Sequence, residues 1–308
     1  MRASYLYAAI YELEEPIAEI AAERYAGSKR EVAKAGLAAF EAEWKAAGTE
    51  LGAKRSDADL SALPAAVRGM VQAARAQGEI YYRAARLYGE QAGPGSGLYY
   101  VGLAKGYLEY ARFAAGLRFP PAPPPSARSL RAEVAALQET LSARYESRPA
   151  TVAPGRFNAS SARLKFAGEL ARLGKPDAAL QTFLDAALAV GLLEAPATAA
   201  APDVRSLEQR SRALRERLED STADPSIGLL YWELAQSGLA ELMRGGATVG
   251  ETTGARRTRV ILDDVLPRYL GFQAETQPGA QASTVAAPGV AATAKRPVTV
   301  TLVRWPFT

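Results

Sequence analysis

The chain has 308 residues, of which 48% are hydrophobic and 23% charged, and this composition is typical of a globular protein with a sizeable core. The formal net charge of +4 permits an anionic partner but does not require one, so we favour a globular protein without one. Histidine and cysteine are both absent, which excludes Ser-His-Asp triads, cysteine nucleophiles, thiolate metal sites and histidine-containing di-iron sites.

The first residues do not have the pattern of a signal peptide. Glu12, Glu14 and Glu15 interrupt the N-terminal apolar run, whereas the apolar region of a signal peptide has no acidic residues. No window offers about 18 uncharged apolar residues, the length of a transmembrane helix. We therefore expect a cytoplasmic protein.

An apolar stripe predicts a helix at the N-terminus, with a kink or a new start at Pro16. The stripe consists of Leu6, Ile10, Leu13, Ile17 and Ile20. Ser28 and Glu31 have the spacing of a capping box, so a second helix is predicted to begin there and to end near Gly48. Its apolar side contains Val32, Leu37, Phe40 and Trp44.

Two longer helices are predicted next. The first begins at Pro64, which suits the first position of a helix, and the run 93–97 ends it. A phosphate-binding loop would need Lys and then Ser or Thr after this glycine-rich run, so the run is read as a plain loop. In the following helix Gly102 and Gly106 are four residues apart, which predicts that another helix approaches closely.

Tyrosines are concentrated in these two helices. They indicate either the edge of the core, with buried rings and hydrated hydroxyl groups, or the lining of a binding groove, and we favour the core edge. For the groove, Tyr100 and Tyr107 are the candidate partner-binding residues. The full set is Tyr81, Tyr82, Tyr88, Tyr99, Tyr100, Tyr107 and Tyr110.

A proline-rich segment, 119–128, predicts the main internal boundary. Its prolines favour an extended polyproline II conformation, which serves either as a stiff linker or as a ligand for an aromatic groove, and we favour the linker. It separates a predicted N-terminal helical block, 1–118, from a predicted C-terminal helical block, 129–272.

The C-terminal block is predicted to be helical throughout. An apolar stripe at 130–145 comes first, and Asp203 is a predicted cap for an arginine-rich helix. Glutamates alternate with these arginines at helical spacing, so a solvated ion-pair face is favoured over an RNA-binding face. Three arginines at 256–259 indicate either an anion site or a frayed helix start, and we favour the latter. Asp263 and Asp264 are adjacent, so on a helix they point in different directions.

The segment after Phe272 has a different composition. Residues 273–296 contain too few apolar side chains to form a core, which predicts a flexible linker. Residues 297–308 alternate in the manner of a strand, and adding this strand to the sheet edge of a partner would satisfy its backbone hydrogen bonds. Packing of the segment on its own helices is the open alternative. The candidate partner-binding residues are Val298, Val300, Leu302, Trp305 and Phe307.

The segment 161–191 predicts two antiparallel helices around a turn at 174–177. It resembles a tetratricopeptide repeat (TPR) in six positions: Ala167, Leu170, Gly174, Ala179, Phe183 and Ala186. It departs from the repeat at Gly191, where a proline is usual. The resemblance covers one repeat, about residues 160–193, and no 34-residue period continues along the chain. It implies a divergent TPR-like array of helical hairpins whose surface binds other proteins.

We therefore expect an all-α fold and a non-catalytic scaffold or adaptor subunit, with no catalytic, cofactor-binding or metal-binding residues. Its expected partners are proteins, and nucleic acid is disfavoured as a partner. Two other functions stay open from the sequence. One is an RNA- or polyanion-binding helical protein, and the other is an all-α enzyme that uses carboxylates.

Overall fold

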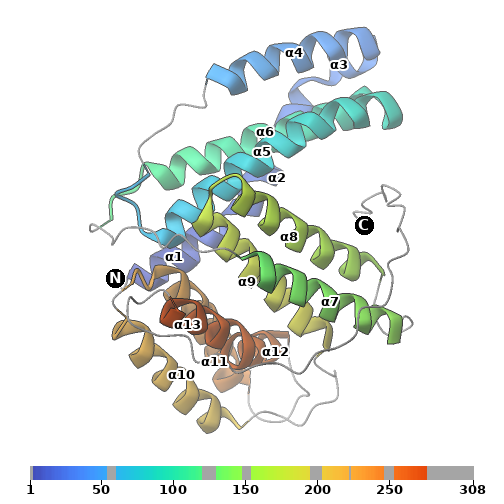
Figure 1. Cartoon of the computed structure of the whole chain (residues 1–308). Helices are drawn as coiled ribbons and strands as arrows, with labels where there is room; N and C mark the ends of the chain where they lie inside the picture. Colours follow the sequence, from blue (N-terminus) through green and yellow to red (C-terminus); the bar gives the residue numbers. More distant parts are fainter. Residues whose placement is uncertain are drawn as a thin grey trace.

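The computed structural model describes residues 3–53, 60–119, 130–147, 154–194, 203–221, 223–245 and 253–275. Every regular element within these ranges is a helix, so the all-α class is confirmed (Figure 1). The elements are α1 (Ala3–Glu12), α2 (Glu14–Ser28), α3 (Arg30–Ala35), α4 (Leu37–Ala53), α5 (Ala65–Ala92), α6 (Pro94–Ala115), α7 (Arg131–Ser147), α8 (Pro154–Arg172), α9 (Pro176–Glu194), α10 (Val204–Glu219), α11 (Ser226–Gly245), α12 (Thr253–Val260), the π-helical turn η1 (Ile261–Val265) and α13 (Leu266–Glu275).

Two predicted segments lie outside the described residues. One is the proline-rich linker, of which only Phe119 is described. The other is the chain after Glu275, which includes the predicted strand 297–308 and the candidate residues Val298, Val300, Leu302, Trp305 and Phe307.

Helices α5 and α6 form the long central pair, and α2 packs along α6. A Cβ atom at Gly102 would lie 2.6 Å from the Ala22 Cα, and one at Gly106 would lie 2.6 Å from the Ala18 Cα. Only glycine permits this backbone approach. The predicted close contact at the two glycines is therefore confirmed, and α2 is the helix that makes it.

The predicted break in the N-terminal helix occurs, at Leu13 rather than at Pro16, but the predicted stripe does not form one buried face. The chain turns at Leu13 between α1 and α2, and Pro16 falls in the first turn of α2, where proline is tolerated. Leu13 is 42% exposed and Ile20 is 56% exposed. The buried side chains of α2 are alanines, because they face the glycines of α6.

Helix α1 leaves α2 and packs against α11 in the C-terminal part of the chain. The Ser4 hydroxyl donates to the Glu233 carboxylate over 2.9 Å. The Tyr110 hydroxyl donates to the carbonyl of Ile10 over 3.1 Å, which joins α6 to the end of α1. This position of α1 brings Tyr11 to the junction of the two blocks.

The predicted capping box is also wrong. The Ser28 hydroxyl donates to the carbonyl of Tyr25, and α3 begins without a side-chain cap. Gly36, with a φ of 92°, then separates α3 from α4. Phe40 of α4 is fully buried between α5 and α6, where Gly89 and Gly97 leave room for its ring. Helices α3 and α4 form one end of the molecule, and α10 lies at the opposite end (Figure 1).

Helices α8 and α9 form the predicted hairpin. Gly174 adopts a φ of 69°, and the amides of Gly174 and Lys175 donate to the carbonyls of Ala171 and Leu170. This is the Schellman end of a helix, in which glycine avoids the strain of a left-handed conformation. Residues that the TPR resemblance placed at the helix crossing are fully buried: Ala167, Leu170, Ala179, Phe183 and Ala186.

Gly191 explains the departure from the repeat pattern. Helix α9 continues past this residue to Glu194, and the Val260 side chain of α12 packs directly on Gly191. A proline or a larger residue would not fit in this contact. Whether the chain is a TPR-like array remains a prediction.

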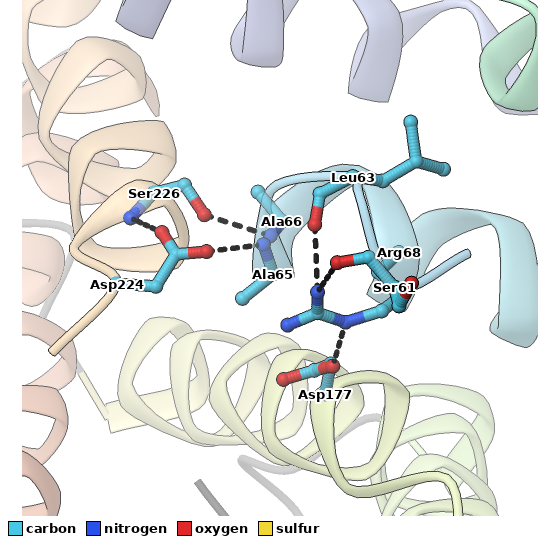
Figure 2. A network of polar contacts seen from close by, with 8 residues as sticks. All are labelled: Ser61, Leu63, Ala65, Ala66, Arg68, Asp177, Asp224 and Ser226. Atoms are coloured by element: carbon cyan, nitrogen blue, oxygen red, sulfur yellow. Dashed lines mark hydrogen bonds and ion pairs between the residues drawn. The ribbon is translucent and has the colours of Figure 1, made fainter. Parts of the chain in front are cut away.

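A network of polar contacts joins α5, α9 and α11 (Figure 2). Asp224 and Ser226 accept hydrogen bonds from the amides of Ala65 and Ala66, over 2.7 and 2.9 Å, and so satisfy the N-terminus of α5. Asp224 also accepts the Ser226 amide over 2.9 Å. One carboxylate therefore fixes the start of two helices that are far apart in the sequence.

The same network contains a buried ion pair. The Arg68 Nε atom donates to Asp177 over 2.5 Å, and its Nη1 atom donates to the carbonyl of Leu63 over 2.6 Å (Figure 2). The two charged side chains are only 4% and 7% exposed. Burial raises the pKa of Asp177, although Arg68 opposes that rise.

The main core is continuous across both predicted blocks. It includes Met70 and Tyr110 from the first block and Phe183 and Tyr231 from the second. Helix α9 lies within this core and is the one described helix long and apolar enough to cross a membrane, by length and composition only. Because 67% of that stretch, Pro176–Leu193, is buried inside the protein, it is weak evidence for a membrane span. The division into blocks 1–118 and 129–272 stays a prediction.

Candidate functional site

Five tyrosines of α5 and α6 form one continuous group of rings, which we call the tyrosine strip: Tyr81, Tyr88, Tyr99, Tyr100 and Tyr107. Tyr88 and Tyr100 stack at 4.2 Å between ring centroids, and Tyr81 lies 5.3 Å from Tyr107. Tyr81 and Tyr88 are seven residues apart, and so are Tyr100 and Tyr107. Two helical turns separate each pair, so each pair shares one helix face.

The strip combines buried and accessible rings. Tyr107, a predicted partner-binding residue, is only 9% exposed and belongs mainly to the core. Tyr100, the other predicted residue, is half-buried, as are Tyr81, Tyr88 and Tyr99. Burial raises the pKa of Tyr81, Tyr99, Tyr100 and Tyr107, so these hydroxyl groups stay protonated at neutral pH. The strip therefore presents uncharged, partly exposed tyrosine rings to solvent.

A row of carboxylates on α2 borders the strip. Glu15, Glu19 and Glu23 are spaced four residues apart and are all exposed. Burial is the largest cause that raises the pKa of Tyr99, and the negative charges of Glu19 and Glu23 raise it further. The charge of Glu15 likewise contributes to the raised pKa of Tyr107. None of the three makes a hydrogen bond or ion pair within the described residues. Like charges at this spacing destabilise a helix, so a cationic ligand would relieve the repulsion.

Near the C-terminal end of α2, lysine side chains already pair with glutamates beside a tyrosine ring. Lys105 pairs with Glu50 over 2.6 Å, and its ammonium lies 4.6 Å from the centre of the Tyr25 ring. Lys29 pairs with Glu43 over 3.0 Å. Lysine, carboxylate and tyrosine thus already combine beside the strip, as expected for cation–π contacts reinforced by charge.

A second acidic group, the Glu14–Asp185 cluster, adjoins the strip and consists of Glu14, Asp185, Tyr11 and Tyr231. The hydroxyls of Tyr11 and Tyr231 approach the same oxygen of Asp185, Oδ1, at 2.8 and 2.7 Å. The Tyr231 hydroxyl also lies 2.9 Å from the carbonyl of Gln181. Helices α1, α2, α9 and α11 each supply one member of the cluster.

Glu14 is the most perturbed carboxyl of the cluster. Burial raises its pKa to about 8, and the charges of Asp185 and Glu15 contribute to the rise. Burial also raises the pKa of Asp185, although the two tyrosine hydroxyls, Arg163 of α8 and Arg257 of α12 oppose that rise. Arg257 itself pairs with Glu12 over 3.8 Å. The cluster therefore holds two carboxyl groups, of which Glu14 keeps its proton up to about pH 8 and Asp185 is stabilised as a carboxylate by two hydroxyls and two arginines.

Other charged groups singled out in the sequence are engaged elsewhere. Asp263 pairs with Arg210, and Asp264 pairs with Arg268 over 2.7 Å, so the two adjacent aspartates do point in different directions. Arg256 donates to the carbonyl of Leu192 over 2.8 Å and so joins α12 to α9. The part of the chain that the structure describes contains no group of three acidic side chains that could hold a metal ion.

The acidic residues of both sites were missed by the sequence interpretation. The signal for the α2 row was present, because Glu15, Glu19 and Glu23 share one helix face. Asp185 also had a signal, since it is the one carboxylate in the middle of the apolar second helix of the hairpin, far from Asp177 at its start and Glu194 at its end. Nothing in the sequence indicated that Tyr11 and Glu14 meet Asp185, because that meeting depends on how α1 crosses to α11.

No protein-family model matches this chain, and no similar curated protein or solved structure is found.

Proposed function

We propose that the chain is a non-catalytic helical adaptor that binds a lysine- and arginine-rich segment of a partner protein along the tyrosine strip. The observation that supports this most is the row of three exposed carboxylates on α2, without partners in the described residues, beside half-buried tyrosine rings. Carboxylates attract the positive charges, and the rings contact both the charges and the aliphatic stems of such side chains.

The spacing of the row suits an extended segment. Acidic residues four apart on a helix rise by about 6 Å each, and alternate side chains of an extended chain are about 6–7 Å apart. A partner with basic residues at every second position can therefore pair with successive glutamates. Exposed ion pairs contribute about 0.2–1 kcal/mol each, so three pairs and one or two ring contacts support a moderate, salt-dependent affinity.

The test is fluorescence anisotropy of a labelled lysine/arginine-rich peptide at low salt. The triple variant Glu15→Gln, Glu19→Gln, Glu23→Gln is expected to bind about ten- to a hundredfold more weakly, which follows from losing about 0.5–1 kcal/mol at each pair. The matched control carries the same change of charge on α10: Glu208→Gln, Glu216→Gln, Glu219→Gln. Equal weakening by both triple variants would show that only net charge attracts the peptide and would contradict the proposal.

A variant that lacks one tyrosine ring distinguishes a cation–π contact from charge attraction by the carboxylates alone. Tyr99→Leu keeps apolar volume on α6 but removes the aromatic face, so binding is expected to weaken about three- to tenfold. Circular dichroism confirms that the variant is folded. Unchanged binding would remove the rings from the proposed site.

We also propose that residues 297–308 provide a second contact with the partner. This proposal depends only on their alternating sequence, which suits addition of a strand to the sheet edge of a partner. Deletion of 297–308 is expected to weaken binding of the whole partner but not of the short basic peptide. Unchanged affinity for the whole partner would remove the second contact and leave the strip untouched.

A further inference from the structure

We propose that residues 295–308 of the same chain occupy the tyrosine strip in the free protein, and that the basic segment of the partner displaces them. The proposal rests on the proposed function, because displacement requires that the strip binds the partner, and it adds the regulation of that site. It also joins the two roles of the C-terminal segment. Once displaced from the strip, residues 297–308 are released for their second contact with the partner.

The part of the chain that the structure describes ends beside the start of α5. The side-chain amide of Gln273, near the end of α13, donates to the carbonyl of Asp224 over 3.3 Å. The Asp224 carboxylate in turn accepts the amide of Ala65, the first residue of α5, over 2.7 Å (Figure 2). Tyr81, where the strip begins, lies about 24 Å further along α5, at a rise of about 1.5 Å per residue.

The stretch 276–294 has the length that this distance requires. A flexible linker of this length and composition spans about 22–26 Å root-mean-square. When the length of a linker matches the span, the effective concentration of the tethered segment is highest, on the order of 1 mM. A contact with a dissociation constant of about 0.1–0.5 mM would therefore keep most of the strips occupied.

The segment is complementary to the strip in charge. Residues 276–308 contain no acidic side chain and three basic ones: Lys295, Arg296 and Arg304. Lys295 and Arg296 directly follow the linker, so they meet the carboxylate row of α2 first at Glu15, which borders Tyr107. Exposed ion pairs are individually weak, which suits a contact that the partner has to displace.

The residues after the basic pair are complementary to the rings. Val298, Val300 and Leu302 alternate, so they share one side of an extended chain. From Val298 to Leu302 an extended chain covers about 13 Å, and the strip is about 11 Å long from Tyr107 to Tyr100. The half-buried, uncharged rings offer these side chains an apolar surface, so docking would remove both surfaces from water.

The segment therefore acts as an internal competitor. The basic segment of a partner binds only those molecules whose strip is open, so its apparent affinity falls with the open fraction. For the effective concentration and the dissociation constants above, the loss of affinity is about three- to tenfold.

The first test is carbodiimide cross-linking of the full chain alone, dilute and at low salt. We expect an amide link within one molecule between Lys295 and a glutamate of the row Glu15, Glu19 and Glu23. An excess of the lysine/arginine-rich peptide is expected to suppress the link. Lys295→Arg keeps the charge but has no amine to react, so it should lose the link and bind the peptide as the wild type does.

The second test is peptide binding by fluorescence anisotropy. The tail variant Lys295→Gln, Arg296→Gln, Arg304→Gln is expected to bind the peptide about three- to tenfold more tightly than the wild type. The matched control makes the same change of charge at exposed arginines of α10: Arg205→Gln, Arg212→Gln, Arg217→Gln. Equal tightening by both variants would show an effect of net charge alone and would contradict the proposal.

The outcomes separate this proposal from the proposed function. If the peptide binds the wild type and the tail variant equally and Lys295 forms no link with α2, the proposal is overturned and the function stands. Links only between two copies of the chain would place the segment on a neighbouring molecule and overturn it as well. If Lys295 links to α2 but the peptide does not bind even the tail variant, the displacement and the proposed function both fail.

Discussion

At the scale of single residues, the protonation of Glu14 links the stability of the fold to pH. Folding raises the pKa of this carboxyl from 4.5 to about 8, so the folded state binds its proton more tightly than the unfolded state. The contribution of this proton is fully present below pH 4.5 and is lost as the pH rises through 8. Its upper bound is ~5 kcal/mol, from 3.5 pKa units at about 1.36 kcal/mol each.

Glu14→Gln should therefore stabilise the protein in a pH-dependent way. We expect little change near pH 4 and a gain of about 1–4 kcal/mol near pH 9, where the wild-type carboxyl is ionised. Urea unfolding at both pH values measures the difference, and Glu109→Gln, at an exposed position of α6, is the control. A gain that is the same at both pH values would contradict the raised pKa of Glu14.

The buried ion pair of Arg68 and Asp177 leads to a second prediction. Arg68→Met leaves the Asp177 carboxylate buried without its partner, which should cost about 3–5 kcal/mol in urea unfolding. The double variant Arg68→Met, Asp177→Leu removes both charges and should recover a large part of that loss. A double variant that loses the sum of the two single effects would show that the pair is not coupled.

These residue-level sites show what the sequence can and cannot predict. The capping role of Asp203 was readable because a cap acts on an amide two residues away, and Asp224 acts at the same distance on the amide of Ser226. The second role of Asp224, on the first amide of α5, was not readable, because its partner is 159 residues away. The partners of Asp177 and Asp185 were hidden for the same reason.

At the scale of elements, the contact between α2 and α6 holds the carboxylate row beside the tyrosines. Gly106→Ala would place a Cβ atom 2.6 Å from the Ala18 Cα, so we expect a loss of about 1–3 kcal/mol and weaker binding of the basic peptide. Gly95→Ala in the same helix meets nothing within 4 Å and should be neutral or slightly stabilising. Equal effects of both variants on stability would contradict the close packing of α2.

The elements also differ in how well their sequences predicted them. The hairpin of α8 and α9 was predictable, because its turn glycine and its buried small residues are local signals. The apolar stripe of α1 and α2 gave a wrong buried face. Its spacing continues unchanged through the turn at Leu13, so the sequence does not show that the helix direction changes there. Alanine gives a weak hydrophobic signal, so the true buried face of α2 was overlooked.

At the scale of the whole molecule, the continuous core leads to a prediction about cooperativity. Trp44 of α4 and Trp232 of α11 report on the two predicted blocks separately, once Trp305 and the other tryptophan are replaced by Phe. We expect both single-tryptophan proteins to unfold in urea at the same midpoint, because α1, α5 and α9 join the blocks in one core. Two separate midpoints would show that the part of the first block around α4 unfolds independently of the C-terminal block.

The surface of the whole molecule includes other acidic and basic faces, so the location of binding is the central question. Carbodiimide cross-linking tests this location most directly, because the reagent joins a carboxylate to an amine in contact with it. The full chain is treated together with a lysine-rich peptide, and mass spectrometry identifies the joined residues. We predict that the peptide becomes joined to Glu15, Glu19 and Glu23 of α2, and that added salt removes these links. Links that fall equally on the exposed glutamates of α10, or that bypass α2, would contradict the account.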